Sequence, residues 1–230
     1  MSLVIPVYNE EVVLPLLHPR LQEFLTRLAL PVEVIFVNDG SKDRSLELLR
    51  VLAAEDPRYR VVSLARNFGH QAAITAGLDY ARGEAVVVMD ADLQDPPEVV
   101  VDMVAKWKEG YDVVYGRRVK REATPFMQLA YKSFYRVFDW FSYVRIPHDA
   151  GDFSLLDRRV VDGLLQFPER DLFLRGLRAF AGFRQTGVDY VRPERMFGTT
   201  TNSLARNLGW AKKGILSFSN TPLNILSFAG

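Results

Sequence analysis

Short apolar runs alternate with helical patterns through the first half of the chain, and this alternation constrains the fold more than any other feature. The apolar runs lie at residues 3–7, 32–38, 60–64, 84–90 and 112–116. Between them, residues 45–54 carry apolar side chains at helical spacing, residues 71–81 are rich in alanine, and Pro96 is expected to open a further helix. This order predicts an α/β fold with a mostly parallel sheet that helices flank.

One edge of this sheet is expected to bind the ligand. Right-handed crossovers place the loops that follow parallel strands along one edge, and open sheets of this kind bind ligands there. Tyr8 and Glu10 follow the first strand, Asp39 follows the second, and Asp90 and Asp92 follow the fourth. The sequence therefore gathers polar residues at the expected binding edge.

The two aspartates after the fourth strand give the strongest chemical signal. Residues i and i+2 at an extended strand end point the same way, so Asp90 and Asp92 can approach one site. Adjacent anions repel unless a cation or proton lies between them, and hard oxygen ligands favour Mg²⁺ or Mn²⁺. Such a metal would neutralise a departing diphosphate. A surface turn in which Asp95 caps the next helix is the alternative, and it explains Asp95 better than Asp90 or Asp92.

The first two loops also have simpler interpretations. Tyr8 offers a stacking surface to a nucleobase and Glu10 offers acceptor oxygens, but a helix start capped by Asn9 accounts for the same residues. Asp39 ends a buried strand, where a carboxylate either serves a ligand or carries a considerable desolvation cost. A turn at Gly40 followed by a helix cap is the alternative for that loop.

Charged residues also follow the fifth strand. The four basic residues within 117–121 form either a solvated face or a second anion-binding site, because arginine matches phosphate geometry. Further along, Asp149 and Asp152 flank a glycine in what we expect to be a loop. We assign no role to His148.

The composition predicts one large domain, or one domain with an appendage, and it excludes cysteine chemistry. The chain has 230 residues, 48% of them hydrophobic, and no cysteine. Its net charge of +1 gives no indication of nucleic-acid binding. No apolar stretch reaches the roughly 20 residues that span a bilayer.

Two segments, 123–145 and 204–218, interleave aromatic and basic residues. This pattern is typical either of a helix packed on the core or of a helix that lies in a membrane interface. Residues 222–230 become steadily more apolar, so we expect a membrane segment to follow them.

Five motifs occur in an order that resembles a known enzyme family. They read VIPVYNE at residues 4–10, NDGSKD at 38–43, NFGHQ at 67–71, DADLQ at 90–94 and DAGDF at 149–153. Together they resemble family 2 glycosyltransferases with the GT-A fold. Within that family the chain is most similar to the polyprenyl-phosphate group, which includes dolichol-phosphate mannosyltransferases and bactoprenol glucosyltransferases. The resemblance covers nearly the whole chain.

The resemblance implies a role for each matching residue. The nucleotide-sugar pocket would be lined by Pro6, Tyr8, Glu10, Asp39 and Asp90. A divalent metal, Mg²⁺ or Mn²⁺, would be held by Asp90, Asp92 and Gln94. The catalytic set would be Asp92, Asp152 and Arg118, with Arg118 on the acceptor phosphate and Asp152 orienting the acceptor or the sugar. Arg195 would bind phosphate near both substrates.

The reaction that the resemblance implies is an inverting transfer of a hexose from a nucleotide diphosphate to a polyprenyl phosphate. UDP-glucose is the first expectation for the donor, and GDP-mannose and UDP-aminosugars stay open. The resemblance also implies a lysine near Thr201, where this chain has none. A family 2 enzyme with a saccharide acceptor, or a silent nucleotide-sugar-binding scaffold, are the alternative functions.

The same resemblance implies a division of the chain and a place in the cell. Residues 1–122 would bind the nucleotide sugar, residues 123–203 would bind the acceptor, and residues 204–230 would form amphipathic juxtamembrane helices. The domain would then act at the cytoplasmic face of a membrane, on whose surface the aromatic and basic segments rest. Self-association into a homo-oligomer stays open.

Overall fold

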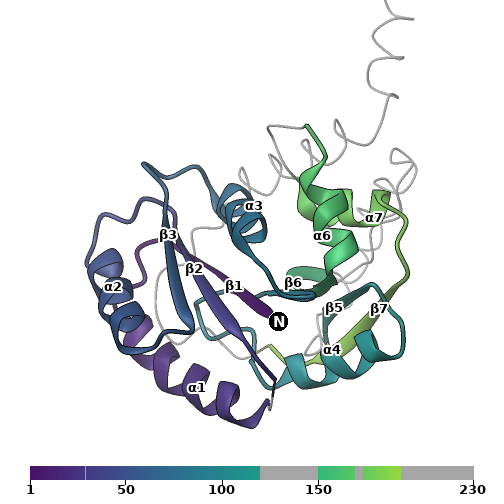
Figure 1. Cartoon of the computed structure of the whole chain (residues 1–230), viewed down its shortest axis with the longest axis horizontal. Coiled ribbons are helices and arrows are strands. Elements are labelled where there is room, and N and C mark those ends of the chain that lie inside the picture. The colour runs from purple at the N-terminus through teal and green to yellow at the C-terminus, as the bar shows by residue number, and fades with distance from the viewer. Residues whose placement is uncertain (29, 120–149, 169–172, 193–230) are drawn as a thin grey trace, which may run out of the picture.

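The computed structural model describes residues 1–28, 30–119, 150–168 and 173–192, and Figure 1 shows how their elements are arranged. Within these residues, one sheet has the strand order β3-β2-β1-β4-β6-β5-β7. Its strands are β1 (Ser2–Val7), β2 (Glu33–Asn38), β3 (Tyr59–Ser63), β4 (Ala85–Val88), β5 (Val113–Arg118), β6 (Ala150–Asp157) and β7 (Gln185–Tyr190). All neighbouring strands are parallel except where β6 pairs with β4 and β5. The prediction of a mostly parallel α/β sheet is confirmed.

Helices cover both faces of this sheet. They are α1 (Leu14–Arg27), α2 (Ser45–Glu55), α3 (His70–Tyr80), α4 (Val99–Lys108), α6 (Arg158–Leu165) and α7 (Leu174–Phe180). Helices α1, α2 and α4 pack on one face, and α3, α6 and α7 pack on the other (Figure 1). The sheet is therefore the middle layer of three.

Strand β1 shows why the apolar runs are continuous and do not alternate with polar residues. Leu3 and Ile5 pack with the helices on one face, whereas Val4 packs with those on the other, and all three are fully buried. A strand covered on both faces needs apolar residues at every position. Each fully buried aliphatic side chain of this kind contributes about 1.5–3 kcal/mol to folding.

Strand β6 corrects the expectation of a loop around Asp152. Ala150–Asp157 is an antiparallel strand between β4 and β5, in which Ser154 pairs with Val88 and Ala150 pairs with Arg117. Because β6 runs against its neighbours, it begins at the edge where the parallel strands end. Asp152 therefore reaches the expected binding edge from the amino end of a strand.

Two further expectations need correction. Helix α4 begins at Val99 and not at Pro96, because residues 96–98 form a turn in which the Pro96 carbonyl accepts a hydrogen bond from the Val99 amide (3.1 Å). Arg117 and Arg118 lie within β5 and not after it.

Several predictions fall on residues outside the described ranges. These are the segments 123–145, 204–218 and 222–230, the basic residues 120–121, Asp149, Arg195 and Thr201. The proposed division at 122 and 203 therefore stays a prediction. Within the described ranges, no helix is long and apolar enough to cross a membrane.

Candidate functional site

A cavity of about 220 Å³ opens at the carboxyl edge of the parallel strands. Its walls come from the loops after β1, β2 and β4 and from the start of α3. The lining residues are Pro6, Val7, Tyr8, Glu10, Asp39, Asn67, His70, Ala73, Asp90, Ala91 and Asp92. Six residues predicted for the site, Pro6, Tyr8, Glu10, Asp39, Asp90 and Asp92, thus line one cavity, while their individual roles stay predictions.

Hydrogen bonds between backbone amides and side-chain oxygens join the loops after β1 and β2. The Asn9 side chain accepts a hydrogen bond from the Lys42 amide (2.8 Å), and the Asn9 amide donates to the Ser41 hydroxyl (3.0 Å). Asn9 adopts a left-handed φ of 56°, which asparagine tolerates better than most residues. It does not cap α1, which begins only at Leu14. Tyr8, which precedes Asn9, is 41% exposed and lines the cavity.

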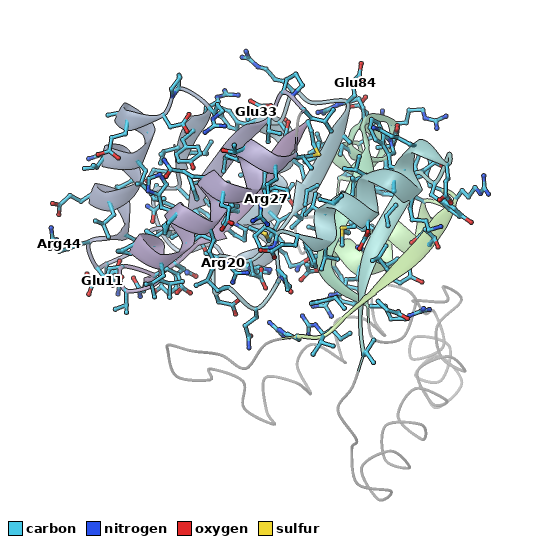
Figure 2. The ribbon with its side chains drawn as sticks, turned by 90° about the horizontal axis from the view of Figure 1, so that it is seen from below. Glu11, Arg20, Arg27, Glu33, Arg44 and Glu84 are labelled. Carbon is cyan, nitrogen blue, oxygen red and sulfur yellow. The ribbon has the colours of Figure 1, made fainter. Side chains whose placement is uncertain are left out.

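A further hydrogen bond joins the same two loops near Glu11 and Arg44. Figure 2 shows Glu11 and Arg44 near each other at one end of the molecule, where the Arg44 amide donates to Glu11 Oε2 (3.0 Å). Glu33, at the start of β2, lies at the top of the same view, away from both of them. The polar loops therefore gather at the carboxyl edge that holds the cavity.

Asp39 has a structural task besides lining the cavity. Only 3% of the residue is exposed, and its two carboxylate oxygens accept hydrogen bonds from the amides of Phe68 (2.7 Å) and Gly69 (2.9 Å). Its neighbour Gly40 has φ +65°, and a Cβ there would lie 2.4 Å from the Arg66 carbonyl carbon. The loop after β2 thus holds the loop that leads into α3.

The two aspartates after β4 create a surplus of negative charge. Burial raises the pKa of Asp90 to about 6; the His70 charge opposes the rise, and the nearby carboxylates of Asp95, Asp92 and Asp152 add to it. Asp92 Oδ2 lies 3.8 Å from Arg192 Nη2. Its Oδ1 accepts a hydrogen bond from the Gln94 amide (3.1 Å). The turn that carries both carboxylates is strained.

The strain lies at Leu93, which has a φ of 61° although it is neither glycine nor asparagine. Such a conformation costs about 1–2 kcal/mol for an ordinary residue. Leu93 is nevertheless buried, so the core holds the turn in this form. The conformation fixes the position of Asp92 relative to the cavity.

A divalent cation fits the chemistry of this turn. Asp90 and Asp92 supply hard oxygen donors, and their mutual repulsion with Asp95 and Asp152 is what a cation would relieve. In the described part of the chain, no three His, Cys, Asp or Glu residues group closely enough to hold a metal by themselves. A bound ion would therefore complete its coordination with water and ligand phosphate, as Mg²⁺ commonly does. Gln94 is half-buried and does not line the cavity.

Asp152 lies behind the cavity wall and does not line it. Arg175 binds it through two hydrogen bonds, Nε to Oδ1 (3.0 Å) and Nη2 to Oδ2 (3.1 Å), and Gln71 Nε2 donates to Oδ2 (3.1 Å). Burial alone would raise the pKa of Asp152, but the charge of Arg175 and contacts with His70 and Arg175 hold it well below its usual range. This carboxylate is engaged by its own chain, so direct contact with substrate stays a prediction.

His70 lines the cavity, although no role was predicted for it from the sequence. Its Nε2 lies 3.5 Å from Asp90 Oδ1 and 3.6 Å from Asp152 Oδ2. Burial lowers the pKa of the imidazole, but the contact with Asp152 and the charges of Asp90 and Asp152 outweigh it and raise the pKa to about 9. The motif at 67–71 could have indicated that His70 lies at the site, because it follows β3 at the edge where the parallel strands end. The sequence contains no comparable indication for Arg175, because its partner Asp152 lies in a different element, the strand β6.

Arg118, at the end of β5, is held by a partly buried network that includes Tyr190 and Asp95. Its Nε donates to the Tyr190 hydroxyl (3.3 Å), which donates in turn to Asp95 Oδ1 (2.7 Å). Asp95 is almost fully buried, and burial raises its pKa although the Tyr190 hydrogen bond and the charges of Arg192 and Arg118 oppose the rise. Asp95 therefore binds Tyr190 and does not cap α4, whose N-cap residue is Glu98.

Comparison with known proteins identifies the family. The model for Glycosyl transferase family 2 matches residues 2–165. The chain belongs to this family. Its membership confirms the resemblance drawn from the five motifs and makes the chain a glycosyltransferase.

Relatives match the chain over its whole length. A Bacillus subtilis protein described as an uncharacterized glycosyltransferase, YkcC, is 49% identical, and the match covers 100% of this chain and 71% of that protein. A prophage bactoprenol glucosyl transferase homolog from Escherichia coli is 38% identical, with 100% of this chain and 75% of that protein covered. The name of the second relative refers to the bactoprenol glucosyltransferases, which the five motifs also resemble.

Solved structures show the same fold. A mannosyltransferase from Pyrobaculum calidifontis, in complex with GDP-Man and Mn²⁺, matches with a TM-score of 0.55 and 23% identity over 85% of this chain and 58% of that chain. S. aureus TarS in complex with UDP-GlcNAc matches with a TM-score of 0.57 and 18% identity over 93% of this chain and 64% of that chain. The predicted GT-A fold is thus confirmed, and this chain spans less than two thirds of either solved chain.

Proposed function

We propose that this glycosyltransferase moves a hexose from a nucleotide-diphosphate sugar to a polyprenyl phosphate, with inversion at the anomeric carbon and with the help of a divalent metal. The observation that carries the proposal is the cavity at the carboxyl edge, which Asp90, Asp92 and the partly exposed Tyr8 all line. Relatives that are named bactoprenol glucosyl transferases support the lipid acceptor.

The cavity offers separate surfaces to the two ends of the donor. Pro6 and Tyr8 supply apolar and aromatic surface for the base, and Glu10 and Asp39 supply acceptor oxygens for base or ribose. Asp90 and Asp92 would hold Mg²⁺ or Mn²⁺, which when bound would neutralise charge on the departing diphosphate. UDP-glucose is the donor we propose first.

The acceptor side depends on positioning more than on proton transfer. A phosphate monoester is already ionised at neutral pH, so its oxygen needs little help from a base to attack the anomeric carbon. Arg118, fixed by Tyr190 at the end of β5, would bind the acceptor phosphate and align it. Arg195 and the aromatic and basic segments would add phosphate and membrane contacts at the cytoplasmic face of the membrane.

The test begins with donor binding. Calorimetric titrations with UDP and GDP, each with and without Mn²⁺, should show metal-dependent binding of one nucleotide. Transfer of labelled glucose from UDP-glucose to undecaprenyl phosphate should follow, with a soluble saccharide as the competing acceptor. Transfer to the saccharide alone would refute the lipid acceptor, and a complete lack of nucleotide binding would refute the transferase site.

A further inference from the structure

His70 occupies the point where the cavity meets the polar network behind it. The residue lines the cavity, and 37% of its side chain is exposed. Its Nε2 lies near Asp90 Oδ1 on one side and Asp152 Oδ2 on the other, at 3.5 and 3.6 Å. The imidazole therefore stands between the carboxylate turn and Asp152, at the wall of the cavity.

The backbone around His70 is fixed from both directions. On the amino side, Asp39 binds the amides of Phe68 and Gly69, the two residues that precede it. On the other side, the Gln71 side chain donates to Asp152 Oδ2 (3.1 Å) and accepts from the Leu174 amide (3.0 Å), which joins α3 to β6 and α7. These contacts leave the start of α3 little freedom to move.

The carboxylate behind His70 is immobilised as well. Arg175 binds Asp152 through two hydrogen bonds, and only 10% of the Asp152 side chain is exposed. Paired hydrogen bonds between arginine and a carboxylate fix orientation as well as distance. Asp152 is thus a rigid support against which the imidazole rests.

We propose that His70 contacts the diphosphate of the bound donor, and that Asp152, Arg175 and Gln71 are positioning residues that hold its imidazole in the cavity wall. This inference rests on the proposed function, which places the diphosphate beside Asp90 and Asp92. Phosphate oxygens need N–H donors as well as cations, whereas the carboxylates of the turn can only accept. Among the described residues that line the cavity, His70 is the basic side chain.

The first experiment separates diphosphate contact from nucleoside contact. UDP, UMP, GDP and GMP are titrated with Mn²⁺ into wild type and His70→Ala, and circular dichroism checks that the variant folds. For the base that wild type binds, the diphosphate should bind about tenfold or more weakly to the variant, as expected for a lost hydrogen bond to a charged group. The monophosphate should bind equally well to both. Equal loss for both ligands, or loss for neither, would overturn the contact.

A double-mutant cycle tests the positioning residues. Arg175→Gln alone should weaken binding of the diphosphate several-fold, and Arg175→Lys should restore part of it. In the His70→Ala background, Arg175→Gln should have almost no further effect, because residues that act through one another are not additive. Additive losses would show a merely structural role and refute the inference. Asp152→Asn provides a second route if Arg175→Gln fails to fold.

The controls separate this inference from the proposed function. Arg27→Gln removes an exposed guanidinium that pairs with Glu23 on α1, and it should leave nucleotide binding unchanged. If wild type binds neither UDP nor GDP, the proposed function itself fails. If wild type binds one of them and His70→Ala binds it equally well, the function stands and the role of His70 is wrong.

Discussion

Asp39→Asn tests whether the carboxylate after β2 holds the loop before α3. The aspartate accepts two charge-assisted hydrogen bonds, from the amides of Phe68 and Gly69, and it is almost fully buried. Asparagine keeps one acceptor oxygen and turns an NH₂ group toward the other amide. Since a hydrogen bond to a charged group contributes about 1.5–3 kcal/mol, losing one and weakening the other should reduce the free energy of unfolding by about 2–4 kcal/mol.

Urea unfolding at neutral pH without nucleotide measures this loss directly. The midpoint should fall, while the slope of the free energy of unfolding against urea concentration stays the same. Hydrogen exchange adds local resolution, since the amide of Phe68 or Gly69 should lose protection. Asp79→Asn, an exposed change on α3, is the matched control and should shift the free energy by less than about 0.5 kcal/mol. An Asp39→Asn protein as stable as this control would refute the structural role of the carboxylate.

Three other perturbations follow from the same structure. Asp92→Ala should abolish transfer and change the free energy of unfolding by less than about 1 kcal/mol in urea, because its carboxylate makes one turn hydrogen bond and a long ion pair. Arg175 holds the pKa of Asp152 below its value in the unfolded chain, so the ionised carboxylate stabilises the fold. This stabilisation is present above about pH 4 and is lost as the pH falls further. Asp152→Asn should therefore flatten the decline of Tm between pH 5 and pH 2. Gly40→Ala should lower the free energy of unfolding by about 2–4 kcal/mol, since its Cβ would meet the Arg66 backbone, and an unchanged urea midpoint would contradict this.

The parallel part of the sheet could be predicted because its signal is local. Strands β1, β2 and β4 are short, mostly apolar runs that both faces of the sheet bury, and the run itself contains that information. The edge strand β3 is only half-buried but still carries the apolar pair Val61 and Val62. The rule that such strands end at one edge then brought Tyr8, Asp39 and Asp90 to one cavity. Local patterns and simple topology were sufficient for that half of the site.

The remaining part depends on pairings between distant residues. Gly151 and the flanking aspartates are typical of a turn, yet β4 and β5 supply hydrogen-bond partners on both sides and make this segment a strand. The pairing of Asp152 with Arg175 likewise depends on how α7 packs, which spacing along the chain does not reveal. His70 lay in a recognised motif, but only the structure placed it beside Asp90.

The pairing of Arg117 with Ala150 means that the chain leaves the sheet and re-enters it at facing rungs of one ladder. Thermodynamically, β5 and β6 are the arms of a hairpin whose connection is very long. Closing such a connection costs only about 0.6 kcal/mol more for each doubling of its length. Changes in the length of the chain between these two rungs should therefore alter the free energy of the sheet very little. The strand pairing that brings Asp152 to the binding edge can thus be kept while that length varies.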